Sequence, residues 1–277
     1  MRRLGALYKL GAGVPKDFVK AYEWYEKASS LGNHEGTCMV GRLYEDGEGV
    51  KKDFRKALEW YSRAAADGNV EAMHRMGHIY EGGPGLECDY VSAREWLERA
   101  AANDSVCATR DLGRFYISGL GGPVDKQKGL EMFNRAIETG DASAMMKMGL
   151  LYRSGDGVGQ DYGKALKWFK KAGEAGDTRG MYFAAMCYED GRGVAKDHAE
   201  ALKWYLKAAD AGDTSAMLEL GRHLYNDNRY SEAREWWDKA LAEGDSKALN
   251  FIGLQYKQGH GVPKDLKEAK NYFRTLC

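Results

Sequence analysis

The sequence has no long apolar run and no net charge. Lys plus Arg and Asp plus Glu number 41 each, so the chain as a whole does not attract nucleic acid or anionic membranes. No stretch approaches the roughly 18 apolar residues of a membrane-spanning helix, so we expect no membrane insertion. Residues 1–5, MRRLG, contain a basic pair without an apolar segment after it. We therefore expect no signal peptide in this chain.

Cysteine is scarce and irregularly spaced. The five cysteines form neither a CxxC nor a Cys/His pattern, which argues against a zinc site of that type. An odd number of unpatterned cysteines favours free thiols in a reducing compartment. The thiols favour a reducing compartment such as the cytoplasm, and the sequence otherwise leaves the localisation open. The cysteines are Cys38, Cys88, Cys107, Cys187 and Cys277.

What the sequence does contain is one pattern that recurs eight times. A reference position returns every 36 residues and takes a last step of 32 residues; its occupants are Gly5, Gly41, Gly77, Gly113, Gly149, Ala185, Gly221 and Gly253. Such a period is typical of stacked helical pairs, whose core grows with the number of copies. We expect one α-solenoid domain over residues 1–277. Its repeats are residues 1–32, 33–68, 69–104, 105–140, 141–176, 177–212, 213–244 and 245–277, the first and last being incomplete.

Each repeat after the first begins with a residue suited to cap a helix. Asn33 starts the second repeat, and its side-chain oxygen can accept from the exposed N–H groups of a first turn. The equivalent residues are Asn69, Ser105, Asp141, Asp177, Asp213 and Asp245. Gly36, Val40 and Tyr44 follow at i, i+4 and i+8, which places them on one face of a first helix. We expect this face to be buried.

A G-x-G pair is expected to end the first helix, because glycine adopts a positive φ without a Cβ clash. The pairs occupy positions 11/13, 47/49, 83/85, 119/121, 155/157, 191/193 and 259/261. Asp53 is then expected to cap the second helix, and Gly68 to end it in a left-handed conformation. The other second-helix caps are Asp17, Asp89, Asp125, Asp161, Asp197 and Asp265, and Asp104 replaces the terminal glycine in the third repeat.

Residues 40–69, VGRLYEDGEGVKKDFRKALEWYSRAAADGN, resemble the Sel-one-like repeat family, a relative of the tetratricopeptide repeats. The resemblance covers essentially the whole chain. It implies an all-α fold, a right-handed α/α superhelical solenoid of about eight helix-turn-helix repeats, and an adaptor role without enzymatic activity. The seventh copy departs from the pattern, since LYNDNRYSEA replaces the G-x-G loop. We expect a local change of superhelical pitch there.

Both ends of the sequence fall within a repeat. A solenoid normally protects its terminal faces with polar capping repeats. We therefore expect either a fragment of a longer protein or ends that pack against another molecule, including end-to-end self-association.

The motifs that could carry catalysis are incomplete. The loop at residues 155–164 lacks phosphate-loop spacing, and Ala165 follows Lys164 where Ser or Thr is needed. No S-x-x-K or G-x-S-x-G motif is present, so we predict no enzyme and no cofactor. His74 and His78 stand at i, i+4, a spacing that can chelate a metal on one helix face. Because Arg75 follows His74 and no third ligand is evident, the sequence predicts no metal site.

The informative positions are those that vary between copies. Two positions, three before and one after the reference residue, are i, i+4 neighbours that we expect to face away from the buried stripe. In the first four copies these positions are rich in basic and imidazole side chains. In the next three copies they are mainly apolar. The predicted partner-binding residues are Arg42, His74, His78, Arg110, Arg114, Met146, Tyr182, Met186, Leu218 and Arg222.

These residues predict a scaffold that binds a protein or peptide in a groove on the concave face, which the resemblance places along the first helices. Arginines could hold the carboxylates of an acidic partner, and the apolar residues could take its apolar anchors. Two alternatives stay open at this point. The chain could be a regulatory or targeting arm of a larger protein, or it could bind glycan or, less expectedly, nucleic acid along the basic stripe.

Overall fold

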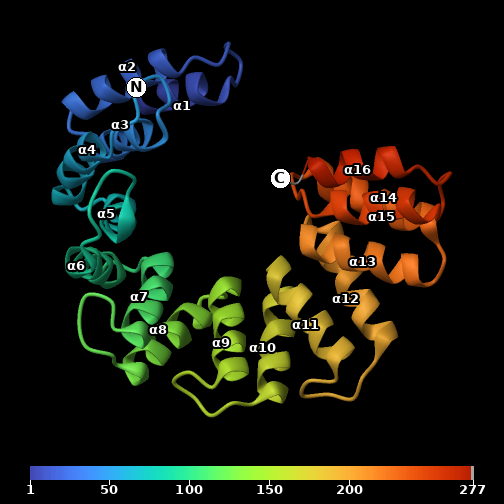
Figure 1. Cartoon of the computed structure of the whole chain (residues 1–277). Helices are drawn as coiled ribbons and strands as arrows, with labels where there is room; N and C mark the ends of the chain where they lie inside the picture. The colour runs from blue at the N-terminus through green and yellow to red at the C-terminus, as the bar shows by residue number, and fades with distance from the viewer. Residues whose placement is uncertain (276–277) are drawn as a thin grey trace. The chain divides into compact units, whose positions relative to one another are not determined.

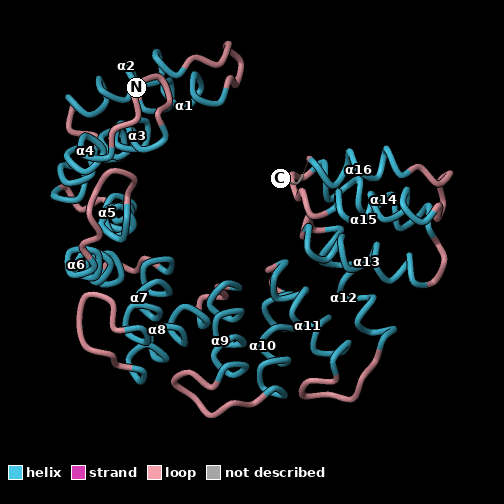
Figure 2. Tube along the Cα trace, viewed as in Figure 1, coloured by secondary structure: helices cyan, strands magenta, loops and turns pink. Residues whose placement is uncertain are grey.

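The computed structural model describes residues 1–275, which contain sixteen helices and no strand (Figures 1 and 2). The chain folds as two compact units, Met1–Thr139 and Gly140–Cys277. Unit 1 contains α1 (Arg2–Leu10), α2 (Phe18–Ser30), α3 (His34–Asp46), α4 (Phe54–Ala66), α5 (Val70–Gly82), α6 (Tyr90–Ala102), α7 (Val106–Ser118) and α8 (Lys126–Glu138). Unit 2 contains α9 (Ala142–Ser154), α10 (Tyr162–Glu174), α11 (Thr178–Asp190), α12 (His198–Asp210), α13 (Thr214–Asn226), α14 (Tyr230–Ala242), α15 (Ala248–Gln258) and α16 (Leu266–Arg274).

The helices alternate as the period predicts, so each repeat is a first helix followed by a second. Odd-numbered helices are first helices and even-numbered helices are second helices. Within each unit they form the stacked helical pairs of an α-solenoid, which confirms the predicted fold class. The single domain over residues 1–277 stays a prediction. None of the helices within residues 1–275 is long and apolar enough to cross a membrane.

The predicted helix caps are confirmed with one correction. Asn33 accepts from the backbone N–H of Gly36 at 2.6 Å, and Asp53 accepts from the backbone N–H groups of Arg55 and Lys56. Asp245 does not cap a first helix in this way. Its carboxylate accepts from Lys247 N–H and its carbonyl from Ala248 N–H, so it starts a tight turn. Helix α15 begins only at Ala248.

The predicted glycine turns are also confirmed with one correction. Gly47 and Gly49 have φ values of 76° and 73°. In the third repeat, however, Gly83 has φ −61° and ψ 136°. Pro84 explains the difference, because a residue before proline is pushed into the extended region. The second helices end as expected, and even Asp104 takes a positive φ of 62° in place of the usual glycine.

The reference glycine lets an aromatic ring approach the first helix. A Cβ on Gly41 would lie 2.7 Å from the ring of Tyr61 on α4. Phe169 on α10 and Trp237 on α14 occupy the corresponding place in their repeats and are almost fully buried. These rings, with the alanines of the second helices, form the core of each unit.

The seventh repeat differs from the others as its sequence predicts. Its two helices, α13 and α14, are joined by residues 227–229 alone, and Asn228 adopts a φ of 60°. Arg229 precedes α14 without a side-chain cap. The change of superhelical pitch expected here stays a prediction.

The four cysteines within residues 1–275 are free thiols, as predicted, and Cys277 lies outside the described residues. Cys38 and Cys187 are buried, whereas Cys88 and Cys107 are exposed. Burial raises the pKa of Cys38 to about 12 and that of Cys187 to about 11.

Candidate functional site: the first-helix face

The predicted partner-binding residues all lie on first helices, but they are not equally accessible. His78 is the most open in unit 1, with 45% of its side chain exposed, whereas His74 is 18% exposed. In unit 2, Tyr182 and Met186 are half-buried. We call the surface formed by the accessible residues the first-helix face. Each unit has its own such face: Arg42, His74, His78, Arg110 and Arg114 in unit 1, and Tyr182, Met186 and Arg222 in unit 2, to which we add Leu150, the residue after reference Gly149.

Met146 and Leu218 lie in the interior, with 2% and 7% exposure, so the expectation that these positions face away from the buried residues is wrong for them. They share a repeat position with His74, whose side chain reaches the first helix of the next repeat. That position therefore borders the neighbouring repeat. We leave both residues out of the proposed contact surface.

In unit 1 the predicted cations already have carboxylate partners from the same chain. Arg114 binds Glu81 of the preceding repeat at 2.7 Å, and Arg42 lies 3.5 Å from Glu71 of the following repeat. Arg110 lies 3.3 Å from Asp111. The face of unit 1 is therefore a mixed-charge surface. The predicted partner-binding residues alone, which are arginines and histidines, had suggested a basic one.

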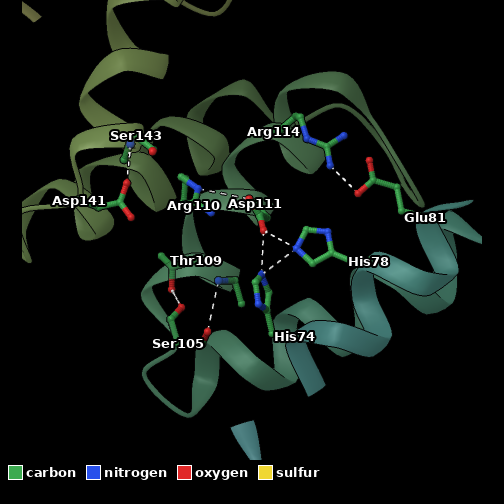
Figure 3. A network of polar contacts seen from close by, with 12 residues as sticks. His74, His78, Glu81, Ser105, Thr109, Arg110, Asp111, Arg114, Asp141 and Ser143 are labelled. Carbon is green, nitrogen blue, oxygen red and sulfur yellow. Dashed lines mark hydrogen bonds and ion pairs between the residues drawn. The ribbon is translucent and has the colours of Figure 1, made fainter. Parts of the chain in front are cut away.

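His74, His78 and Asp111 converge at one point of this face (Figure 3). The histidines come from successive turns of α5 and the carboxylate from α7 of the next repeat. Asp111 Oδ2 lies 2.9 Å from His74 Nε2 and 3.2 Å from His78 Nε2. Burial acts to raise the pKa of Asp111, but the hydrogen bonds with both imidazoles and the charge of Arg110 outweigh it and hold that pKa well below its usual range.

Asp111 is the residue that the sequence reasoning missed. It follows His74 by 37 residues, one more than the period, and therefore occupies the place of Arg75 in the next copy. Asp111 would have been found by looking for ligand side chains about one repeat after His74, on the first helix of the next repeat. Asp111 is therefore a third potential ligand beside the two histidines, and the expectation that they have none is wrong.

A second polar cluster joins three helices of unit 2. Glu189 of α11 accepts from Tyr205 of α12 at 2.6 Å and from Arg222 of α13 at 2.8 Å. Burial acts to raise the pKa of Glu189, but these hydrogen bonds lower it below its ordinary value. His223 Nε2 lies 3.3 Å from the same carboxylate. Burial and the charge of Arg222 lower the pKa of His223.

Apolar side chains make up the other part of the unit 2 face. Leu150 on α9 and Tyr182, Phe183 and Met186 on α11 are partly buried against the core. The Phe183 ring stacks on buried Phe169 with centroids 5.1 Å apart. Tyr182 packs against both Phe183 and Tyr205, with centroids 5.7 Å apart in each case. The inner sides of these residues are thus fixed by the fold while their outer sides reach the surface.

The hydroxyl groups beside the histidine cluster serve the helix termini. Ser105 Oγ accepts from the backbone N–H of Ala108, and Thr109 Oγ1 donates to the carbonyl of Ser105 at 2.9 Å (Figure 3). Neither hydroxyl is bonded to an imidazole.

Comparisons with known proteins agree with this architecture. The family model for the Sel1 repeat matches residues 1–33, 34–69, 70–105, 108–141, 142–177, 178–213, 214–245 and 246–277. A solved Sel1 repeat protein from Oxalobacter formigenes is 29% identical, with a TM-score of 0.69 over 86% of this chain and 96% of that chain. A protective antigen of uropathogenic Escherichia coli with an SLR fold is 32% identical, with a TM-score of 0.56 over 99% of this chain and 67% of that chain. No curated protein matches the sequence. The chain belongs to the Sel1 repeat family.

Proposed function

We propose that this chain is a non-enzymatic scaffold that binds a protein or peptide partner on its first-helix face. Sel1 repeat proteins are generally scaffolds of this kind. Stacked helical pairs offer a large preformed surface, so little conformational entropy is lost when a partner docks on them.

The observation that carries this proposal is the apolar cluster of α9 and α11. Leu150, Tyr182 and Met186 vary from copy to copy, so the repeat pattern does not require them. Each is held from behind by core residues and reaches the surface at its outer side. Rigid aromatic side chains and adaptable methionine are favourable contact residues at protein interfaces. This part of the face suits apolar anchors of a partner.

The mixed-charge face of unit 1 suits a polar partner segment. A guanidinium has five N–H donors, so Arg42 or Arg114 can bind a partner's carboxylate while it keeps its own. Because each arginine is already paired, the gain from an acidic partner is smaller than for an isolated cation. The same pairing disfavours a phosphate backbone as the ligand. We therefore favour a protein or peptide partner over nucleic acid on this face.

The experiment is affinity capture from a lysate of the source organism, followed by mass spectrometry and repeated with two substitutions on the face, Leu150→Lys and Met186→Lys. The matched control is Leu206→Lys on second helix α12, since Leu206 is 44% exposed and is not among the residues of the first-helix face. We expect each face substitution to weaken the captured partner's binding at least about tenfold, as loss of an interface hot spot does. The control should bind like the unchanged chain.

The mixed-charge surface is tested in the same assay by the double substitution Arg110→Glu and Arg114→Glu. A partner that keeps its affinity for all the face variants, or that loses it as strongly with Leu206→Lys, would sink the proposal.

A further inference from the structure

We propose that His74, His78 and Asp111 bind one divalent first-row transition-metal ion of the Zn²⁺ class. The inference goes beyond the scaffold function and does not depend on it, because the metal alone is the ligand. It rests on the mutual placement of three ligand atoms from two adjacent repeats (Figure 3).

The three atoms form a nearly equilateral triangle. The edges are 2.9 Å from His74 Nε2 to Asp111 Oδ2, 3.2 Å from His78 Nε2 to Asp111 Oδ2, and 3.0 Å between the two imidazole nitrogens. A metal with bonds of about 2.1 Å at tetrahedral or octahedral angles separates adjacent ligand atoms by about 3.0–3.4 Å. The triangle already has these dimensions, so binding requires no large movement of either helix.

Protons alone cannot make all three contacts favourable. Each Nε2 presents either a proton or a lone pair, and an ionised carboxylate oxygen only accepts. If both nitrogens are protonated, each N–H can donate to Asp111, but the two N–H dipoles then repel each other because the nitrogens are 3.0 Å apart. If one is deprotonated, its lone pair faces the oxygen of Asp111. A cation that contacts all three atoms removes this conflict.

The surroundings favour a metal that keeps open coordination positions. His78 is 45% exposed, so water can reach the site from its side. Asp111 is 15% exposed, and Arg110 lies near its other oxygen, Oδ1, which leaves Oδ2 directed at the histidines. Two imidazoles and one carboxylate are a donor set that suits Zn²⁺ and its neighbours in the first transition row.

The polar cluster of unit 2 provides a contrast. Glu189, Glu219 and His223 also bring three ligand atoms together. There, the guanidinium of Arg222 lies 2.8 Å from Glu189 and 2.6 Å from Glu219. Because a cationic side chain already bridges these carboxylates, we infer no metal site at that cluster.

The test is titration of the chelator-treated, untagged full chain with Zn²⁺ alone by calorimetry and with Co²⁺ alone by visible absorption. We expect one equivalent to bind, with a Co²⁺ spectrum that lacks a thiolate charge-transfer band, which rules out the exposed cysteines as ligands. The thermal midpoint should rise with Zn²⁺ concentration, because the ion ties α5 to α7 only in the folded chain.

The substitutions His78→Ala and Asp111→Asn should each reduce the affinity at least about tenfold and abolish the thermal shift. His78→Ala is the more informative of the two, since an exposed side chain is removed and folding is checked by circular dichroism. The matched control, His198→Ala beside the unit 2 cluster, should bind metal like the unchanged chain. Binding below a fifth of an equivalent, or affinity that is equal in the folded His78→Ala variant, overturns the proposal.

Discussion

Gly49 and Gly68 both have a positive φ, but only Gly49 lies against another repeat. A Cβ on Gly49 would approach the backbone carbonyl carbon of Phe18 to 2.5 Å, whereas a Cβ on Gly68 would have no neighbour within 4 Å. Gly193 has the same relation to the backbone of Tyr162 in unit 2. In these two repeats the second glycine of the G-x-G pair therefore allows the loop to touch the start of the preceding repeat's second helix, whereas Gly85 of the third repeat has no such neighbour.

Replacing each of these glycines by alanine separates the two roles. Gly68→Ala should cost about 1–2 kcal/mol from backbone strain alone. Gly49→Ala should cost that amount and about 1–3 kcal/mol more, because the methyl group meets backbone that cannot rotate away. Urea unfolding of the two variants measures the difference. Equal losses would show that the contact with Phe18 contributes nothing.

At the scale of elements, the unit 2 helices are joined by polar contacts as well as by apolar ones. Glu189 on α11 accepts hydrogen bonds from α12 and α13. The ordinary pKa of a glutamate is about 4.3, and that of Glu189 in the folded chain is lower. A lowered folded pKa means that the ionised group stabilises the fold above about pH 4.3. This stabilisation is lost as the pH falls through the folded pKa.

The substitution Glu189→Gln should therefore reveal a pH-dependent gap in stability. At neutral pH the variant should unfold at a lower urea concentration than the unchanged chain. The gap should narrow as the pH falls from about 4.3 through the lower folded pKa of Glu189, since below that pKa both chains are uncharged at this position. Glu174→Gln, at an exposed position on α10, serves as the control and should show no such gap. A gap that is constant with pH would contradict the role assigned to the Glu189 charge.

The helix caps and turns could be predicted from the sequence, whereas the contacts between first helices of adjacent repeats could not. Asn33 and Gly47 have their predicted roles because a cap or a turn depends on a few neighbouring residues. The burial of Met146 and the contact of Asp111 with His74 depend on how one first helix lies beside the next. The i, i+4 spacing fixes the side of a helix but not what covers that side.

At the scale of the molecule, the ion pairs and the surface apolar side chains both bear on where a partner can dock. The equal numbers of acidic and basic residues become cross-repeat ion pairs such as Arg114 with Glu81. Apolar side chains on α9 and α11 of unit 2 are partly exposed, and exposed leucines also lie on α1 (Leu4, Leu7 and Leu10) and on α15 (Leu254).

Hydrogen–deuterium exchange of the full chain, with and without its captured partner, tests the scaffold account most directly. Backbone amides covered by a docked partner exchange more slowly because local opening is suppressed. The account predicts protection in peptides from α9 and α11, with exchange unchanged in those from the intervening second helix, α10. Protection confined to second helices would contradict it.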